Sequence, residues 1–148
     1  MSADPHAIEL AIAAGQSAKS KKASEVIALD VSERLALTDM FVLATGKNER
    51  QVRAIVDAVD EAMEMRGVKL LRREGLREAH WVLCDYGIIV VHVQHEEDRR
   101  FYALERLWAD APVVEIPDVA DLPAAAEPES SAGDSEAISP LDLIRGDL

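Results

Sequence analysis

The amino-acid sequence predicts a mixed α/β fold in which a β-sheet of about five strands carries flanking helices. Three segments have apolar residues at helical spacing, and five shorter apolar runs are typical of strands. The predicted order is α-β-β-α-β-β-β-α. Strands that follow one another directly favour a mixed sheet over a fully parallel one.

The first helix and two strands occupy the N-terminal third. Residues His6–Gln16 are Ala-rich with helical periodicity. Glu25–Val31 and Asp39–Thr45 are short apolar runs, and we expect them to be the first two strands.

The central helix, Asn48–Gly67, has the strongest local signals. Asn48 is a predicted N-cap, and Gln51 three residues later completes a capping box. Gly67 stands where a helix often ends in a left-handed residue. The apolar residues recur at helical spacing: Val52, Ile55, Val56, Val59 and Met63.

Three further strands are predicted at Val68–Arg72, His80–Tyr86 and Ile88–Gln94. Only Gly87 separates the last two, which indicates a hairpin. Their continuous apolar runs favour a sheet covered on both faces.

The last helix is predicted to start at an N-cap, Asp98, and to stop before Pro112. We assign the apolar residues at its core spacing to the interior: Phe101, Leu104, Leu107 and Trp108.

Composition divides the chain into a folded domain, residues 1–116, and an acidic tail, residues 117–148, predicted to be disordered. The tail holds eight acidic residues and one basic residue, so it contributes −7 of the net charge of −12. An acidic chain repels phosphate backbones and is attracted to basic protein surfaces.

The single cysteine, Cys84, excludes an internal disulfide and fits a reducing compartment. No window is apolar enough to span a membrane, and residues 1–6 lack the pattern of a signal peptide. We therefore expect a cytoplasmic protein.

The motifs of the common phosphate-binding loops are absent. The turn Thr45–Asn48 leads from a strand to a helix, so its amides are an alternative anion site, although such turns are common without one. Nucleotidyl transfer needs paired carboxylates that hold two metal ions. The strands predicted from Val68 to Gln94 carry a single acid, Asp85, so this chemistry is not expected.

A metal site and a catalytic thiol are also not expected. His92 and His95 are three residues apart, so on a strand they face opposite sides. Cys84 lies inside an apolar strand, where thiols are usually packed and inert.

The hairpin, residues 80–94, contains polar and aromatic residues that interrupt its apolar runs. One interpretation makes Trp81 and Tyr86 core or edge aromatics and His92 a structural histidine. The other makes them part of a binding surface.

Several separated motifs resemble the ribosomal silencing factor S (iojap-like) family. They are Trp81–Gly87 (WVLCDYG), Val90–Val93 (VVHV), Arg100–Trp108 (RFYALERLW), Ala28–Val31 (ALDV), Thr38–Val42 (TDMFV), Gly46 with Gln51–Ile55, and Arg73–Gly75 (REG). The resemblance runs from about Ala7 to Pro112.

The resemblance implies a fold related to nucleotidyltransferases but without their catalytic carboxylates, no enzymatic activity and no cofactor. It also implies a translational repressor. Such a protein binds the large ribosomal subunit through its ribosomal protein numbered fourteen, blocks joining of the small subunit when nutrients are limiting, and has a proposed role in large-subunit maturation.

A steric mechanism needs a docking surface and no reactive group. On the matching motifs, the expected partner-binding residues are Glu74, Trp81, Asp85, Tyr86, His92, Arg100 and Tyr102. Arg72, Arg73 and Arg77 are candidates for contact with neighbouring ribosomal RNA, with a solvated basic loop as the alternative.

Two other functions remain as alternatives. A nucleotide-binding module would show metal-dependent transfer that depends on Asp85. A scaffold protein would form a homodimer through exposed strand edges.

Overall fold

The computed structural model describes residues 2–118. The predicted tail, residues 117–148, lies outside the described residues except for its first two. The elements in chain order are α1 (Pro5–Ser20), β1 (Ser24–Asp30), β2 (Met40–Gly46), α2 (Glu49–Met65), β3 (Arg72–Glu74), β4 (Trp81–Asp85), β5 (Ile89–His95), α3 (Glu96–Tyr102), α4 (Leu104–Leu107) and β6 (Val113–Val114).

The strands form one mixed sheet in the order β3-β4-β5-β2-β1-β6. Strands β2 and β5 are parallel, and every other neighbouring pair is antiparallel. The predicted fold class is confirmed, but the sheet has six strands instead of five. The missed strand, β6, is only two residues long and pairs with Ala28 and Leu29, so it has no alternating pattern of its own.

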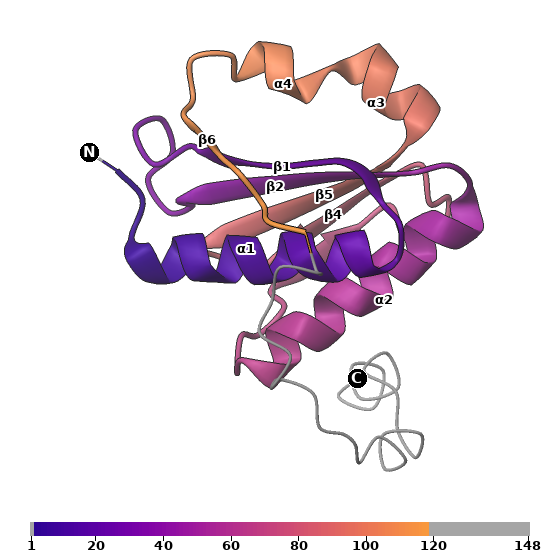
Figure 1. Cartoon of the computed structure of the whole chain (residues 1–148), viewed down its shortest axis with the longest axis horizontal. Helices are drawn as coiled ribbons and strands as arrows, with labels where there is room; N and C mark the ends of the chain where they lie inside the picture. The colour runs from indigo at the N-terminus through magenta and orange to yellow at the C-terminus, as the bar shows by residue number, and fades with distance from the viewer. Residues whose placement is uncertain (1, 119–148) are drawn as a thin grey trace.

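Helices cover both faces of the sheet (Figure 1). Helices α1 and α2 pack on one face, and α3 and α4 lie over the other. Every residue of β2 is buried, as are six of the seven residues of β5. The expectation that continuous apolar strands are covered on both faces is therefore confirmed for the two central strands.

Helix α1 packs closely because its buried face is made of small residues. Asp4 caps the helix by accepting from the His6 amide, and Pro5 stands at the first position. Near its end, a Cβ on Gly15 would come within 2.8 Å of the Ile116 side chain, so the small face also admits the segment after β6. The buried alanines of this face with no exposed surface are Ala7, Ala11, Ala14 and Ala18.

The signals predicted for α2 are confirmed. The Asn48 side chain accepts from the Gln51 amide at 2.8 Å, and the Gln51 side chain accepts from the Lys47 amide at 2.7 Å. Gly67 follows the helix with φ of +72°. The second bond uses the Lys47 amide of the turn Thr45–Asn48, which argues against the alternative anion site there.

The third strand lies later than predicted. Val68–Arg72 was expected, whereas β3 covers Arg72–Glu74. Val68 and Leu70 pack against the core from an extended connection, so their apolar character reflects burial and not strand pairing. The hairpin prediction is confirmed: β4 and β5 pair around Gly87, whose φ is +90°.

The last helix was predicted wrongly in two respects. It starts after His95, which caps α3 by accepting from the Glu97 amide, and not at Asp98. Ala103 then adopts a left-handed conformation (φ 45°) that separates α3 from α4. Because this break changes the phase of the helix, Phe101 is 80 % exposed and Leu107 is 64 % exposed. The core assignment holds for the other two residues, since Leu104 is buried and Trp108 is half-buried.

Candidate docking face

Four rings form a row across the sheet face that lies under α3 and α4. The Trp108 and Phe41 rings are 5.1 Å apart, Phe41 and His92 are 4.8 Å apart, and His92 and Trp81 are 6.1 Å apart. Arg34 lies over Trp108 at 4.4 Å from the ring centroid, a cation–π contact. The row connects α4 to β4 through the two central strands.

His92 is the buried link in this row. Its Nδ1 accepts a hydrogen bond from Trp81 Nε1 at 3.1 Å, so the neutral ring carries its proton on Nε2. Burial lowers the pKa of His92 from 6.5 to about 4. The histidine therefore stays neutral at physiological pH and orients the Trp81 indole.

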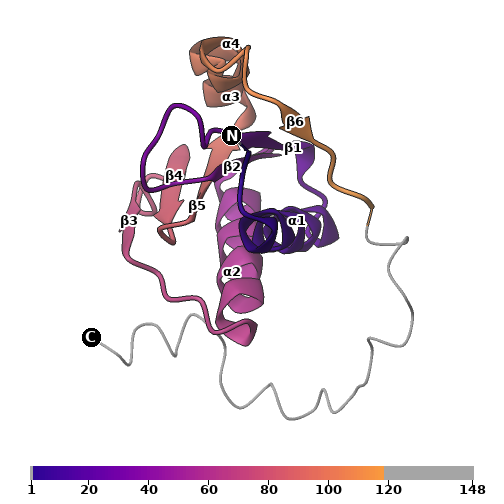
Figure 2. The ribbon, with the colours of Figure 1, turned by 90° about the vertical axis from the view of Figure 1, so that its left-hand side faces the viewer.

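Strand β4 alternates between the two faces of the sheet. Val82 and Cys84 are buried on the side of α1 and α2, whereas Trp81, Leu83 and Asp85 are half-buried on the other side. In Figure 2, helices α3 and α4 lie over the part of the sheet away from β3 and β4, so the end of the sheet formed by β3 and β4 is less covered.

The edge strand β3 completes the half-covered surface. Its register places Arg72 opposite Asp85 and Glu74 opposite Leu83. Both β3 side chains are 59 % exposed and approach each other at 3.4 Å. We call the five residues with this shared orientation the open face: Arg72, Glu74, Trp81, Leu83 and Asp85.

The open face combines apolar and charged groups. Trp81 and Leu83 pack against the buried apolar cluster on this face of the sheet, which contains Phe41, Leu43 and Val90. One carboxylate oxygen of Asp85 accepts the Gly87 amide at 2.8 Å, which fixes the turn of the hairpin. A rigid apolar patch with charges at its rim is the usual composition of a protein-binding surface.

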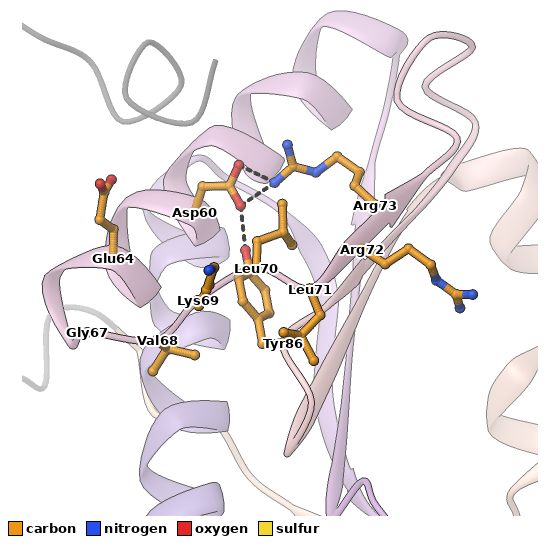
Figure 3. A pocket seen from close by; sticks show the side chains of 10 residues that line it. All are labelled: Asp60, Glu64, Gly67, Val68, Lys69, Leu70, Leu71, Arg72, Arg73 and Tyr86. Carbon is orange, nitrogen blue, oxygen red and sulfur yellow. Dashed lines mark hydrogen bonds and ion pairs between the residues drawn. The ribbon is translucent and has the colours of Figure 1, made fainter. Parts of the chain in front are cut away.

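A buried polar group locks the hairpin to α2 from the opposite face (Figure 3). Arg73 and the Tyr86 hydroxyl both donate to the Asp60 carboxylate. Burial raises the pKa of Asp60 and that of Tyr86, while the two donors partly offset the effect at Asp60. The three residues lie at a hollow of about 840 Å³. They join α2, β3 and the hairpin turn into one unit.

The structure brings only part of the expected partner-binding set together. Glu74, Trp81 and Asp85 share the open face. Tyr86 and His92 are each only 5 % exposed, so the structure favours the interpretation that makes them structural residues over direct contact with a partner.

The remaining expected residues lie on α3. Arg100 is exposed, and the side chain of Tyr102 lies outside those that the structure describes. Arg99, which directly precedes Arg100, is buried and donates to Thr45 Oγ1 at 2.6 Å and to Glu105 at 2.8 Å. Among the RNA candidates, Arg73 is occupied by Asp60, whereas Arg72 and Arg77 are exposed.

Sequence reasoning missed Asp60 and Arg99 as structural residues. A signal existed for Asp60: it lies four residues after Val56 and three before Met63, on the apolar side of α2. A charge in an apolar stripe indicates a buried partner. Arg99 offers no comparable local pattern.

Cys84 and Asp85 are the two residues whose side chains were weighed for reactive chemistry. Cys84 is buried, as its apolar strand predicted, and burial raises the pKa of its thiol to about 11, which disfavours the thiolate. Asp85 belongs to no group of three candidate metal ligands among the described residues. No helix in residues 2–118 is long and apolar enough to cross a membrane.

The fold is that of a mixed α/β domain with one half-covered sheet face. The family described as "Ribosomal silencing factor during starvation" matches residues 4–139. The chain therefore belongs to the ribosomal silencing factor family, and the resemblance seen in its motifs is confirmed.

Individual relatives agree with this assignment. The chain is 41 % identical over 99 residues to "Ribosomal silencing factor RsfS" of Halalkalibacterium halodurans, covering 67 % of this chain and 85 % of that protein. A crystal structure of a Chromobacterium violaceum protein has a TM-score of 0.66 and 31 % identity, covering 80 % of this chain and 94 % of the other. A mouse protein named "Mitochondrial assembly of ribosomal large subunit protein 1" is 27 % identical over 93 residues, covering 61 % of this chain and 41 % of its own length.

Proposed function

We propose that this protein represses translation in the cytoplasm by binding the large ribosomal subunit and preventing the small subunit from joining it. The family description places such proteins in ribosomal silencing during starvation, and the name of the mouse relative refers to the large subunit. The family description supports a role in silencing under nutrient limitation, and the name of the mouse relative supports a contribution to large-subunit maturation.

The observation that carries the proposal is the open face. It presents an indole, an apolar side chain and two carboxylates on a rigid strand pair next to an uncovered sheet edge. The net charge of −12 favours a basic partner. We propose that the partner is the ribosomal protein numbered fourteen of the large subunit, with Trp81 as the apolar anchor and Glu74 and Asp85 facing basic side chains.

Tyr86 and His92 act indirectly in this proposal. Tyr86 holds the hairpin on α2 through Asp60, and His92 orients the Trp81 indole. Arg100 of α3 extends the surface beyond the open face, with Tyr102 two residues later in the sequence. Of the three arginines expected to contact adjacent ribosomal RNA, Arg72 and Arg77 are exposed and keep that role in the proposal.

Steric exclusion requires no reactive group. Occupying the joining surface of the large subunit is sufficient, so neither a cofactor nor catalysis enters the mechanism. The relatives are named as silencing factors and not as enzymes, which agrees with this mechanism.

Sedimentation through sucrose gradients tests the proposal. The purified full-length chain should travel with large subunits and should reduce the yield of joined ribosomes when small subunits are added. Comigration with neither subunit would contradict it.

Self-association is a separate property to measure. The exposed edge strand β3 is three residues long and charged, which disfavours pairing with another copy. Light scattering on the protein without ribosomes should show whether a homodimer forms through another surface.

A further inference from the structure

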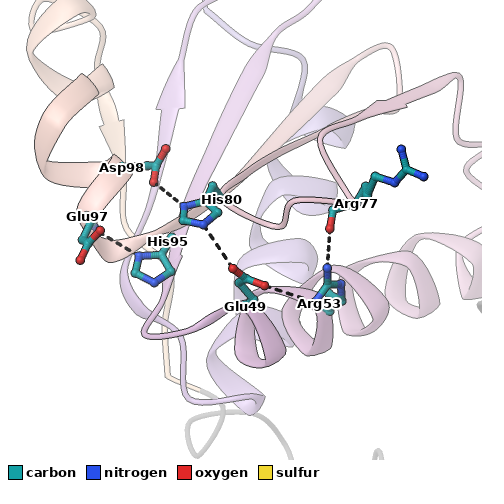
Figure 4. Close-up of polar contacts among 7 residues, drawn as sticks. All are labelled: Glu49, Arg53, Arg77, His80, His95, Glu97 and Asp98. Carbon is teal, nitrogen blue, oxygen red and sulfur yellow. Dashed lines mark hydrogen bonds and ion pairs between the residues drawn. The ribbon is translucent and has the colours of Figure 1, made fainter.

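A cluster of two histidines and two carboxylates lies where four elements meet, beside the start of β4 (Figure 4). His80 precedes β4, His95 ends β5, Glu49 begins α2, and Asp98 lies in the first turn of α3. Three residues of the cluster, His80, His95 and Asp98, each offer one potential ligand atom. These three atoms lie within 4.8 Å of one another. All three residues are partly exposed, so the cluster is open to ions from solvent.

The contacts inside the cluster are close. His80 Nδ1 lies 3.1 Å from Asp98 Oδ1, and His80 Nε2 lies 3.3 Å from Glu49 Oε2. The His80 and His95 rings are stacked with centroids 5.0 Å apart. Two carboxylates thus surround two imidazoles, with Arg53 at 4.0 Å from Glu49 as the nearby cation.

The position in the fold is one that binds ligands in α/β proteins. Gly46 and His95 are partners at the carboxyl ends of the parallel strands β2 and β5. The chain continues from β2 into α2 on one face and from β5 into α3 on the other (Figure 1). Adjacent parallel strands whose connections leave to opposite faces form a crevice at a topological switch point.

The geometry points to a divalent metal site, and we propose that His80, His95 and Asp98 bind Zn²⁺. Nitrogen and carboxylate ligands suit this ion at about 2.0–2.2 Å. Ligand atoms in a tetrahedral site are then about 3.4 Å apart. The 3.1 Å pair already meets this spacing, and the 4.8 Å limit requires a modest rotation of partly exposed side chains.

Glu49 completes the site from outside the ligand set. If His80 binds the ion through Nδ1, its Nε2–H donates to the Glu49 carboxylate, which fixes the ring and its tautomer. A ligating histidine held by a carboxylate on its second nitrogen is a common arrangement in zinc proteins. The fourth position is left for water.

His95 has to exchange one contact to take part. Its Nδ1 accepts the Glu97 amide at 3.2 Å and caps α3. A neutral imidazole has one unprotonated nitrogen, so coordination by His95 replaces this cap. Zinc would instead tie the start of α3 to the ends of β4 and β5.

No local sequence pattern pairs these residues. The pair of histidines that the sequence suggests, His92 and His95, is separated by the structure, because His92 is buried against Trp81. His80 and Asp98 are 18 residues apart and meet only through the hairpin.

Isothermal titration of the tag-free full-length chain with Zn²⁺ tests the proposal, with visible absorption of Co²⁺ as a second readout of coordination. We expect one saturable site and a rise in Tm with added Zn²⁺. The variants His80→Ala and His95→Ala should each weaken binding about a hundredfold, and Glu49→Gln about tenfold. His6→Ala, an exposed histidine on α1, should leave affinity unchanged.

Asp98→Asn keeps the size of the side chain and serves as the variant least harmful to folding. It should also lose at least tenfold in affinity while its circular dichroism matches that of the parent chain. The proposal is overturned if the parent chain shows no saturable binding, or if His80→Ala, His95→Ala and Asp98→Asn bind Zn²⁺ as tightly as the parent does.

Discussion

The two faces of the sheet differ in how completely they are covered. On the face of α1 and α2, Val42, Val82 and Val91 have no exposed surface. The buried Asp60 carboxylate on this side accepts hydrogen bonds from Arg73 and Tyr86. On the other face, β4 presents Trp81, Leu83 and Asp85 only half-buried. The difference leads us to propose that the first face mainly supplies stability and that the second contains the binding surface.

The largest expected effect comes from removing the Asp60 carboxylate, to which Arg73 and Tyr86 donate hydrogen bonds on the face of α1 and α2. Asp60→Ala leaves the Arg73 guanidinium, whose side chain is 11 % exposed, without its carboxylate. We expect a loss of about 3–5 kcal/mol in the free energy of unfolding, measured by urea denaturation. Tyr86→Phe, which removes one donor, should cost about 1–2 kcal/mol. Equal and small losses in both variants would contradict the assignment of a buried lock.

The pH dependence of stability tests His92. Its folded pKa of about 4 is below the unfolded value of 6.5, so the unfolded chain binds more protons between these values. Stability should therefore fall as the pH drops from 6.5 to 4 and remain unaffected by this residue above 6.5. The loss in the free energy of unfolding that is due to His92 amounts to roughly 3 kcal/mol over this pH range, because a shift of one pKa unit corresponds to about 1.4 kcal/mol.

His92→Gln keeps an acceptor for Trp81 but cannot ionise in this range. The difference in unfolding free energy between the parent and this variant should change across pH 4–6.5, because the other titrating groups are common to both chains and cancel in the difference. A constant difference would show that His92 is not a buried neutral group.

Two leucines of α4, one buried and one exposed, test which side of this helix packs on the sheet. Leu104 is 8 % exposed and Leu107 is 64 % exposed. Leu104→Ala should cost about 2–3 kcal/mol in unfolding free energy, and Leu107→Ala less than about 0.5 kcal/mol. The reverse order would mean that the helix packs on the sheet with its other side.

The smallest expected effect in free energy concerns binding alone. Glu74→Lys reverses an exposed charge on the open face and should weaken large-subunit binding about tenfold, or about 1.4 kcal/mol. Glu64→Lys reverses the charge of an exposed residue of α2, and this variant should bind as the parent does. Cosedimentation at fixed salt measures both, and equal binding by the two variants would remove Glu74 from the interface.

The parts of the fold with local causes were predictable from sequence. The central helix has its cap at Asn48, its apolar stripe and its terminal Gly67 within one segment, and Gly87 alone defines the hairpin. The positions of β3 and the break at Ala103 were not predictable, because each depends on contacts with distant residues. Val68 and Leu70 resemble strand residues only because they are packed.

The candidate site was predictable in composition but not in arrangement. The motifs identified Trp81, Asp85 and Glu74, and strand alternation explains why the first two share a face. The burial of His92 comes from Phe41 and Trp81, which contact it from neighbouring positions in the sheet and not from its own segment. Only the folded sheet shows that it orients an anchor.

A map of the chain on the large ribosomal subunit tests the central claim most directly. Cryo-electron microscopy of the complex should place the open face, with Trp81 and Glu74, against the ribosomal protein numbered fourteen, at the surface that the small subunit would cover. A complex bound through the covered face of α1 and α2, or at a site that leaves the joining surface exposed, would contradict the account.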